Sequence, residues 1–221
     1  MMVRYYWWKV LAGILLLYAV IAGFIVSVPE TMILQTMRNL FYHVGMWFGM
    51  FAMLITSFIY SLRYLRGFRE KEDIRAVEAV NVGMMFGMLG IITGMVWANY
   101  TWGAPWVKDP KLNGAAVGIF IYLAYLILRG SIDDHQKRAK VSAVYNIFAF
   151  ILWIVFVLIL PRLSGESIHP GRETSPVLPM HLDPGMRFVF YPAMLGWILL
   201  GFWILDIRVR IRKIKLTMEN W

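Results

Sequence analysis

The chain of 221 residues is 60% hydrophobic and only 16% charged, whereas a soluble domain is roughly half apolar and about a quarter charged. One soluble domain cannot bury so much apolar surface, so the composition excludes an ordinary soluble protein and predicts that lipid is the main solvent. The net charge of +9 is explained by membrane topology and anionic lipid, and it requires no nucleic acid.

Six segments are long and apolar enough to cross a bilayer, since a hydrocarbon core of about 30 Å requires about 20 residues of helix. Their interiors are nearly free of charge, as expected when an ionised side chain at mid-helix costs about 2.5–3.5 kcal/mol. The chain is therefore predicted to be an all-α integral membrane protein, with one six-helix domain over residues 1–221. In chain order the expected helices are Tyr6 to Val28, Leu40 to Leu62, Ala79 to Tyr100, Leu112 to Leu128, Val141 to Leu160 and Phe188 to Ile207.

The basic residues are divided unequally between the two sides of this helix bundle. With loops assigned alternately, 16 of the 22 Lys and Arg residues flank the side of the termini and 6 flank the other side. Basic residues concentrate on the cytoplasmic side of membrane proteins. The sequence therefore predicts that both termini are cytoplasmic and that the loops of residues 97–112 and 161–187 are external.

Several classes of function lack their usual motifs. The chain has no cysteine, which excludes thiolate metal sites, disulfides and the covalent haem attachment of c-type cytochromes. It has no Walker motif and no Gly-x-Gly-x-x-Gly fingerprint, so neither ATP hydrolysis nor dinucleotide binding by those motifs is expected. The glycines of the third helix are better explained by close helix packing than by chemistry. They are Gly83, Gly87, Gly90 and Gly94.

The segment of residues 97–112 is rich in large aromatic rings. They are Trp97, Tyr100, Trp102 and Trp106. Glycine and proline interrupt the segment and indicate an external loop or a segment lying on the surface. One interpretation is an interfacial aromatic belt, as in many membrane proteins. The other is a surface for a large, flat, apolar ligand.

Three of the four histidines fall on the predicted external side. His43 lies one turn inside the outer end of the second helix, and an ionisable residue at this depth is by default a functional candidate. His169 and His181 lie in the loop of residues 161–187. His135 stands beside acidic residues in a cytoplasmic loop and is expected to be solvated. Each histidine taken alone is also compatible with a structural role.

Together these residues describe a haem-type site. Neutral imidazoles are axial ligands of haem iron, and an apolar aromatic surface suits the porphyrin. Lys108, Lys111 and Arg172 are available for the propionates. Zinc is matched less well, because imidazoles without a nearby carboxylate or cysteine make a poor ligand set.

The order of these features resembles one known family. Residues 102–111, with the sequence WGAPWVKDPK, resemble the tryptophan-rich WWD segment of the haem-handling proteins of cytochrome c biogenesis. Six helices with both ends inside, and a histidine-bearing segment on either side of this loop, are similar to the CcmC-type family over almost the whole chain. The larger CcsA-type relatives carry extra helices for which 221 residues leave no room.

This resemblance implies a function and partners. CcmC-type proteins bind haem b transiently at the outer face of the bacterial inner membrane. They deliver it to a haem chaperone for cytochrome c assembly, beside the membrane and ATPase subunits of an ABC transporter. The resemblance thus implies an assembly factor and not an enzyme.

The resemblance also implies residue roles. His43 takes the position of the first iron ligand, and the spacing to the stretch 183–186 favours His169 over His181 as the second. The expected haem-binding residues are these two histidines and the cations Lys108, Lys111 and Arg172. The others are Trp97, Trp102, Gly103, Trp106 and Asp109.

Lys108 departs from the family pattern WGxxWxWD, because it stands where the last tryptophan is expected. The segment thereby loses stacking area and gains a cation. Either Lys108 pairs with a propionate, or the segment holds haem more loosely than its relatives do.

Two other functions remain open at this point. A membrane b-type cytochrome subunit for electron transfer needs paired histidines on facing helices, and only His43 lies inside a predicted span. A transporter that moves haem across the membrane needs a polar path through the bundle. Asn81, Thr93 and Asn146 are few for such a path.

Overall fold

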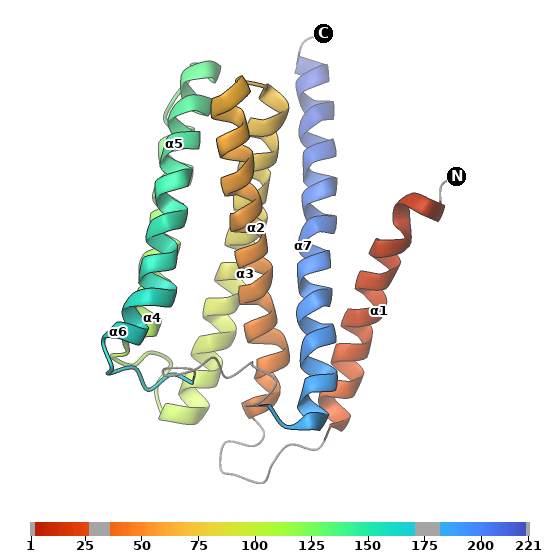
Figure 1. Ribbon diagram of the computed structural model, residues 1–221, viewed down its shortest axis with the longest axis vertical. Helices are drawn as coiled ribbons and strands as arrows, with labels where there is room; N and C mark the ends of the chain where they lie inside the picture. Colours follow the sequence, from red (N-terminus) through yellow and green to blue (C-terminus); the bar gives the residue numbers. More distant parts are fainter. Residues whose placement is uncertain (1–2, 27–35, 171–181, 220–221) are drawn as a thin grey trace.

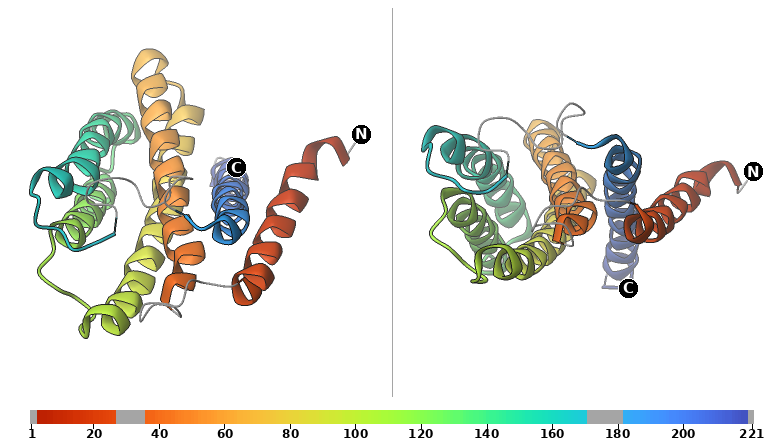
Figure 2. Two further views of the ribbon diagram at one scale, coloured as in Figure 1. Left: turned by 60° about the horizontal axis from the view of Figure 1, so that its bottom comes forward. Right: turned by 90° about the horizontal axis from the view of Figure 1, so that it is seen from below.

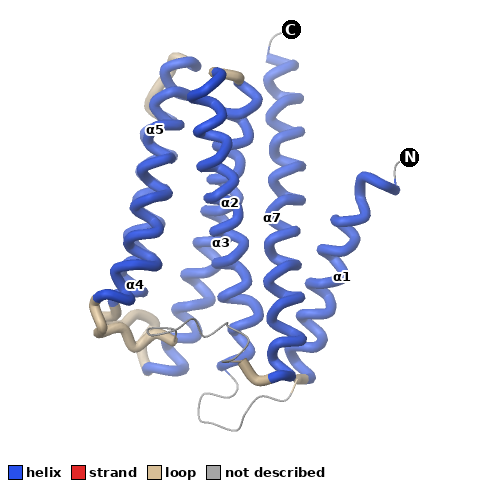
Figure 3. Tube along the Cα trace, in the orientation of Figure 1, coloured by secondary structure: helices blue, strands red, loops and turns tan. Residues whose placement is uncertain are grey.

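The computed structural model describes residues 3–26, 36–170 and 182–219, and all regular structure within these ranges is helical. In these described ranges six helices are long and apolar enough to cross a membrane, which confirms the predicted all-α fold with six spans. They lie side by side along the long axis of the molecule (Figures 1 and 3). The elements are α1 (Val3–Ile25), η1 (Thr36–Asn39), α2 (Leu40–Gly67), α3 (Glu70–Trp102), α4 (Pro110–Gly130), α5 (His135–Ile154), η2 (Val155–Ile159), α6 (Leu160–Leu163) and α7 (Pro184–Glu219).

The helix α2 occupies the centre of the bundle and packs against α3, α5 and α7. On one flank α4 pairs with α5. On the other flank α1 packs on α7 and leans away from it toward the N-terminus (Figures 1 and 2). The main cluster of buried side chains lies between α2, α3, α4, α5 and α7, and a smaller one lies where α1, α2 and α7 meet.

The contact between α2 and α3 depends on the glycine series of α3. A methyl group at Gly87 would lie 2.7 Å from the Met50 sulfur, and one at Gly83 would lie 3.2 Å from Leu54 Cδ2. A side chain at either position would displace Met50 or Leu54 from this close contact. The structure therefore confirms the predicted packing role of these glycines.

Several helices extend beyond the predicted apolar segments. Helix α3 begins at Glu70 and ends at Trp102, and α7 continues to Glu219. Hydropathy marks the part of a helix that lies in lipid, whereas hydrogen bonding and caps determine where the helix ends. At the start of α3, the acidic first turn suits the positive end of the helix dipole.

The tryptophan-rich segment 97–112 is helical at both ends, so its non-helical part is shorter than the predicted loop. Only residues 103–109 connect α3 to α4. Gly103 ends α3 with a φ of 77°, in the left-handed region that favours glycine. Asp109 is the N-cap of α4 and is followed by Pro110, which is a favoured first helical residue.

The two ends of the bundle differ in what they contain. The C-terminus lies at one end and the N-terminal part of α1 points toward it, so this is called here the termini end, whereas residues 103–109 and 164–170 lie at the opposite end, called the loop end (Figure 1). An even number of spans requires this arrangement. Which end faces the cytoplasm stays a prediction.

Candidate functional site

The candidate site lies at the loop end and is built by four parts of the chain. These are the first turn of α2, the last turns of α3, the connection of residues 103–109 with the start of α4, and the segment 164–170 that follows α6. His43 contacts α3 at Thr93 and Gly94, and His169 contacts α3 one turn later at Trp97. Residues four apart lie on the same face of a helix. The two histidines therefore meet neighbouring turns of α3.

His43 is held by a hydrogen bond that sets its tautomer. Its Nδ1 lies 3.1 Å from Thr93 Oγ1, and this hydroxyl lies 2.9 Å from the Leu89 carbonyl oxygen. A hydroxyl has one proton to donate, and the carbonyl can only accept. We therefore assign the proton of the imidazole to Nδ1, which donates to Thr93. The Nε2 atom is left with its lone pair.

The His43 ring also depends on a close approach between α2 and α3. A methyl group at Gly94 would lie 2.8 Å from His43 Cε1. The Trp47 ring lies edge-on to the imidazole, at 6.3 Å between centroids. Gly94 on one side and Trp47 on the other thus restrict the orientation of the ring.

His169 lies against two indole rings of α3. Its ring centroid is 5.9 Å from that of Trp97 and 6.2 Å from that of Trp102, and the two indoles meet edge-to-face at 4.9 Å. Its Nδ1 lies 3.0 Å from the Pro170 carbonyl oxygen. Since that oxygen only accepts, Nδ1 carries the proton and Nε2 again keeps its lone pair.

The surroundings of His169 keep its ring neutral. Burial, and next the Lys111 ammonium, lower the pKa of His169 to about 4. A charge on His43 would lower this pKa further, so the two imidazoles lie within electrostatic range of each other. At neutral pH the His169 imidazole is therefore a neutral nitrogen donor.

Asp109 ties the segment carrying His169 to the start of α4. Its carboxylate is fully buried and accepts from the backbone N–H groups of Lys111 (2.8 Å) and Leu112 (3.2 Å). It also accepts from the Ser167 hydroxyl at 2.9 Å and from the Ile168 N–H at 2.7 Å. Burial raises the pKa of Asp109, but these hydrogen bonds outweigh it and hold the pKa below its usual value. Asp109 is thus a positioning residue for His169.

The remaining candidate residues differ in position. Lys111 is half-buried, and its Nζ lies 3.4 Å from the Pro170 carbonyl oxygen, next to His169. Lys108 is exposed. Trp106 is 38% exposed and donates its Nε1–H to Asn113 at 3.2 Å.

The structure therefore separates the predicted residues into groups. It brings His43, His169, Trp97, Trp102, Asp109 and Lys111 together. Trp106 shares none of the ring contacts that join Trp97, Trp102 and His169 in the described part of the chain. Arg172 and His181 lie outside the described residues.

Sequence reasoning missed Thr93 and Ser167. Thr93 was detectable, because α2 and α3 form an antiparallel hairpin and His43 and Thr93 each lie 25 residues from Phe68 at its turn. Ser167 lies 58 residues from Asp109, and no local pattern in the sequence indicates this contact.

Comparison with known proteins agrees with the sequence resemblance. A family model described as Heme exporter protein C, CcmC, matches residues 2–218. Heme exporter protein C of Paracoccus denitrificans (strain Pd 1222) is 28% identical over 171 residues, which are 75% of this chain and 67% of that protein. Heme exporter protein C of Escherichia coli (strain K12) is 27% identical over 144 residues, 63% of this chain and 54% of that protein.

A CcsA protein matches over a shorter part of the chain. Cytochrome c biogenesis protein CcsA of Pelargonium hortorum is 33% identical over 118 residues, which are 53% of this chain and 36% of that protein. The chain thus spans between 36% and 67% of the length of these three relatives. Because the family model covers nearly all of the sequence, the chain belongs to the heme exporter protein C (CcmC) family.

Proposed function

We propose that this protein binds haem at its loop end, through Nε2 of His43 and of His169, and delivers it for cytochrome c assembly. One observation carries the proposal. Each imidazole uses Nδ1 for a hydrogen bond within the protein, to Thr93 or to Pro170, and among the described residues Nε2 has no hydrogen-bond partner, so it can serve as a ligand atom. Two neutral imidazoles are a common axial ligand pair for haem iron.

The neighbouring side chains also suit this cargo. Trp97 and Trp102 offer apolar ring surface beside His169. The Lys111 ammonium is close enough to influence His169, and a propionate carboxylate is a suitable partner for it. Asp109 makes no direct contribution in this scheme, because its carboxylate is already saturated by protein donors.

The family membership supports an assembly factor and not an enzyme. Relatives of this chain are named heme exporter protein C and cytochrome c biogenesis protein. We infer the corresponding partners for this chain, namely a haem chaperone and the membrane and ATPase subunits of an ABC transporter. Haem b is then held transiently as cargo.

The proposed location is a bacterial inner membrane, with the loop end on the external side. The excess of Lys and Arg at the termini end, 16 against 6, supports this orientation. Reporter fusions near Asp109 should then behave as external, and those near Glu70 or His135 as cytoplasmic. A cytoplasmic signal from the fusion near Asp109 would refute the orientation.

Absorption spectra of the purified protein with bound haem test the two ligands. His43→Ala and His169→Ala should each lower haem retention several-fold or change the spectrum, because each removes one axial donor. His135→Ala, at the termini end, is the matched control and should have no effect. If His181→Ala abolished binding while His169→Ala left it intact, the assignment of His169 would be wrong.

The same preparation separates delivery from electron transfer. A delivery factor should carry substoichiometric haem that leaves when a haem chaperone is added. A b-type cytochrome subunit would keep stoichiometric haem through repeated reduction and oxidation. The latter result would refute the delivery function and leave the ligand assignment unchanged.

A further inference from the structure

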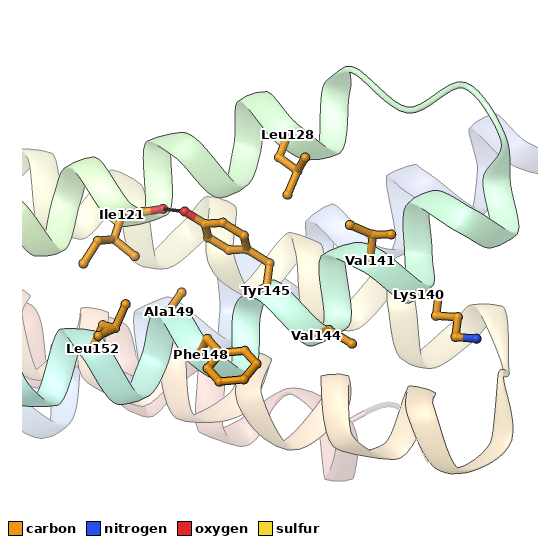
Figure 4. Close-up of a pocket in the computed structure, with 9 residues that line it drawn as sticks. All are labelled: Ile121, Leu128, Lys140, Val141, Val144, Tyr145, Phe148, Ala149 and Leu152. Atoms are coloured by element: carbon orange, nitrogen blue, oxygen red, sulfur yellow. Dashed lines mark hydrogen bonds between the residues drawn. The ribbon is translucent and has the colours of Figure 1, made fainter.

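An apolar groove of about 590 Å³ lies between α4 and α5, away from the loop end. Leu128 of α4 and Val141, Val144, Phe148 and Leu152 of α5 line it, and Lys140 stands at one end (Figure 4). Phe148 is 63% exposed, so the groove opens toward the surroundings of the bundle. In a membrane-spanning pair of helices, those surroundings are lipid or another membrane segment.

The length of the groove matches one leaflet of a bilayer. From Lys140 to Leu152 the helix rises about 18 Å at 1.5 Å per residue. Half of a hydrocarbon core of about 30 Å is about 15 Å. The groove ends near the middle of the span from His135 to Leu163, which favours an acyl chain as its occupant.

The groove contains one charged group, at its end toward the termini end. The Tyr145 hydroxyl, which also lines it, donates to the Ile121 carbonyl oxygen at 3.2 Å and is therefore satisfied (Figure 4). The ion pairs of the described residues use Lys9, Arg69, Arg129, Arg208 and Arg210, and none of them includes Lys140. The Lys140 ammonium is thus available to an external anion.

We propose that this groove binds one anionic phospholipid of the leaflet at the termini end. One acyl chain lies along α5 between Val141 and Leu152, and the headgroup phosphate contacts Lys140. A basic residue at the membrane surface attracts anionic lipid, and an ammonium–phosphate contact is a charge-assisted hydrogen bond. This site is separate from the haem site and does not depend on the proposed function.

Native mass spectrometry of the full chain tests the proposal. The protein is exchanged into mixed micelles with equal amounts of phosphatidylglycerol and phosphatidylcholine of identical acyl chains. The parent should retain one phosphatidylglycerol preferentially, and Lys140→Gln should lose this preference several-fold. Lys213→Gln, which removes an exposed lysine of α7 at the same end, should keep it. Equal preference in the parent and Lys140→Gln, or an equal loss in Lys213→Gln, would overturn the proposal.

A second pair of variants tests the acyl chain. Val144 is 42% exposed in the groove, and Val144→Trp should fill the groove and reduce retention of the lipid. Val10→Trp is the control, because Val10 is 61% exposed on α1 outside the groove. Undiminished retention by Val144→Trp would overturn the proposal. Phe148→Cys places a single cysteine in the groove, since the chain has no other cysteine. A copurifying protein chain that shields this cysteine would also overturn the proposal.

Discussion

The two ends of the bundle use their charged groups differently. Toward the termini end, carboxylates pair with cations, as in Arg129–Asp73, Arg208–Glu78 and Lys9–Asp206, each at 2.6 Å. At the loop end, the described ranges contain no such pair. The Asp109 carboxylate instead accepts from backbone N–H groups and a hydroxyl. The cation Lys111 and the two imidazoles of the loop end therefore stay available for a ligand, whereas charges at the termini end hold helices together.

The largest expected effect comes from breaking the buried pair at the termini end. Both side chains of Arg129 and Asp73 are only 12% exposed. Arg129→Leu leaves the Asp73 carboxylate buried without a partner, and such a change costs about 3–5 kcal/mol. Thermal unfolding in detergent should show this loss, while haem occupancy of the folded fraction stays at the parental level. The double variant Arg129→Leu with Asp73→Leu should recover most of the stability.

The contrast between the two ends would be wrong if Arg129→Leu changed the haem spectrum of the protein that remains folded. The two ends of the bundle would then be coupled, and the division between a structural end and a binding end would be wrong.

The next largest effect is expected at Asp109. Asp109→Ala removes the acceptor for four hydrogen bonds. We expect a cost of roughly 2–4 kcal/mol, because the N-cap of α4 contributes about 1 kcal/mol and the bonds from Ser167 and Ile168 contribute about 1 kcal/mol each. The variant should lose haem in the same way as His169→Ala, with the same residual spectrum, because the segment 164–170 is released from α4.

Asp134→Ala is the matched control for Asp109→Ala. Asp134 caps α5 by accepting from the Lys137 N–H at 2.6 Å, at the termini end. Its loss should cost about 1 kcal/mol, as for an ordinary N-cap, and should leave haem binding unchanged. A normal haem spectrum in Asp109→Ala would show that Asp109 does not position His169.

These two caps show how far the sequence alone specifies the molecule. The six spans were predictable from apolar length, and Asp109 before Pro110 is a recognisable helix start. That Asp109 also holds Ser167 was not predictable, because the contact joins segments 58 residues apart. The sequence places the end of the third helix near Tyr100, whereas α3 continues to Trp102, because aromatic rings and glycine breaks mark an interface but do not determine where a helix ends. Trp106 resembles Trp102 in sequence, yet the turn at Gly103 separates the two rings.

The pKa of His169 predicts a pH dependence of the haem-free protein. Its pKa is about 4 in the folded state and about 6.5 in an unfolded chain. The unfolded state therefore binds more protons between these values, and stability should fall as the pH drops from about 7 toward 4. At pH 5 this one group lowers the free energy of unfolding by about 2 kcal/mol relative to neutral pH. His169→Gln should flatten this part of the melting-temperature profile, and an unchanged profile would show that His169 is solvated.

A smaller effect is expected from the hydrogen bond that orients His43. Thr93→Val keeps the shape of the side chain but removes the acceptor of the Nδ1 proton. A net hydrogen bond contributes about 1 kcal/mol, so haem should dissociate about five-fold faster. Thr56→Val is the control, because Thr56 bonds only to the carbonyl oxygen of Ala52 in its own helix among the described contacts. Equal dissociation rates in both variants would refute the positioning role of Thr93.

The smallest expected effect concerns Lys108, the cation that replaces an aromatic residue of the family pattern. Its side chain is exposed, and exposed ion pairs contribute only about 0–1 kcal/mol. Lys108→Glu should weaken haem retention more than Lys108→Ala at low salt, because it adds repulsion to the loss of attraction. High salt should remove this difference, since it screens exposed charges.

Lys108→Trp restores the stacking surface and should retain haem at least as well as the parent, with less dependence on salt. Haem occupancy of the three variants at low and high salt decides between the roles. Equal occupancy of Lys108→Glu and the parent at low salt would show that Lys108 points away from the propionates.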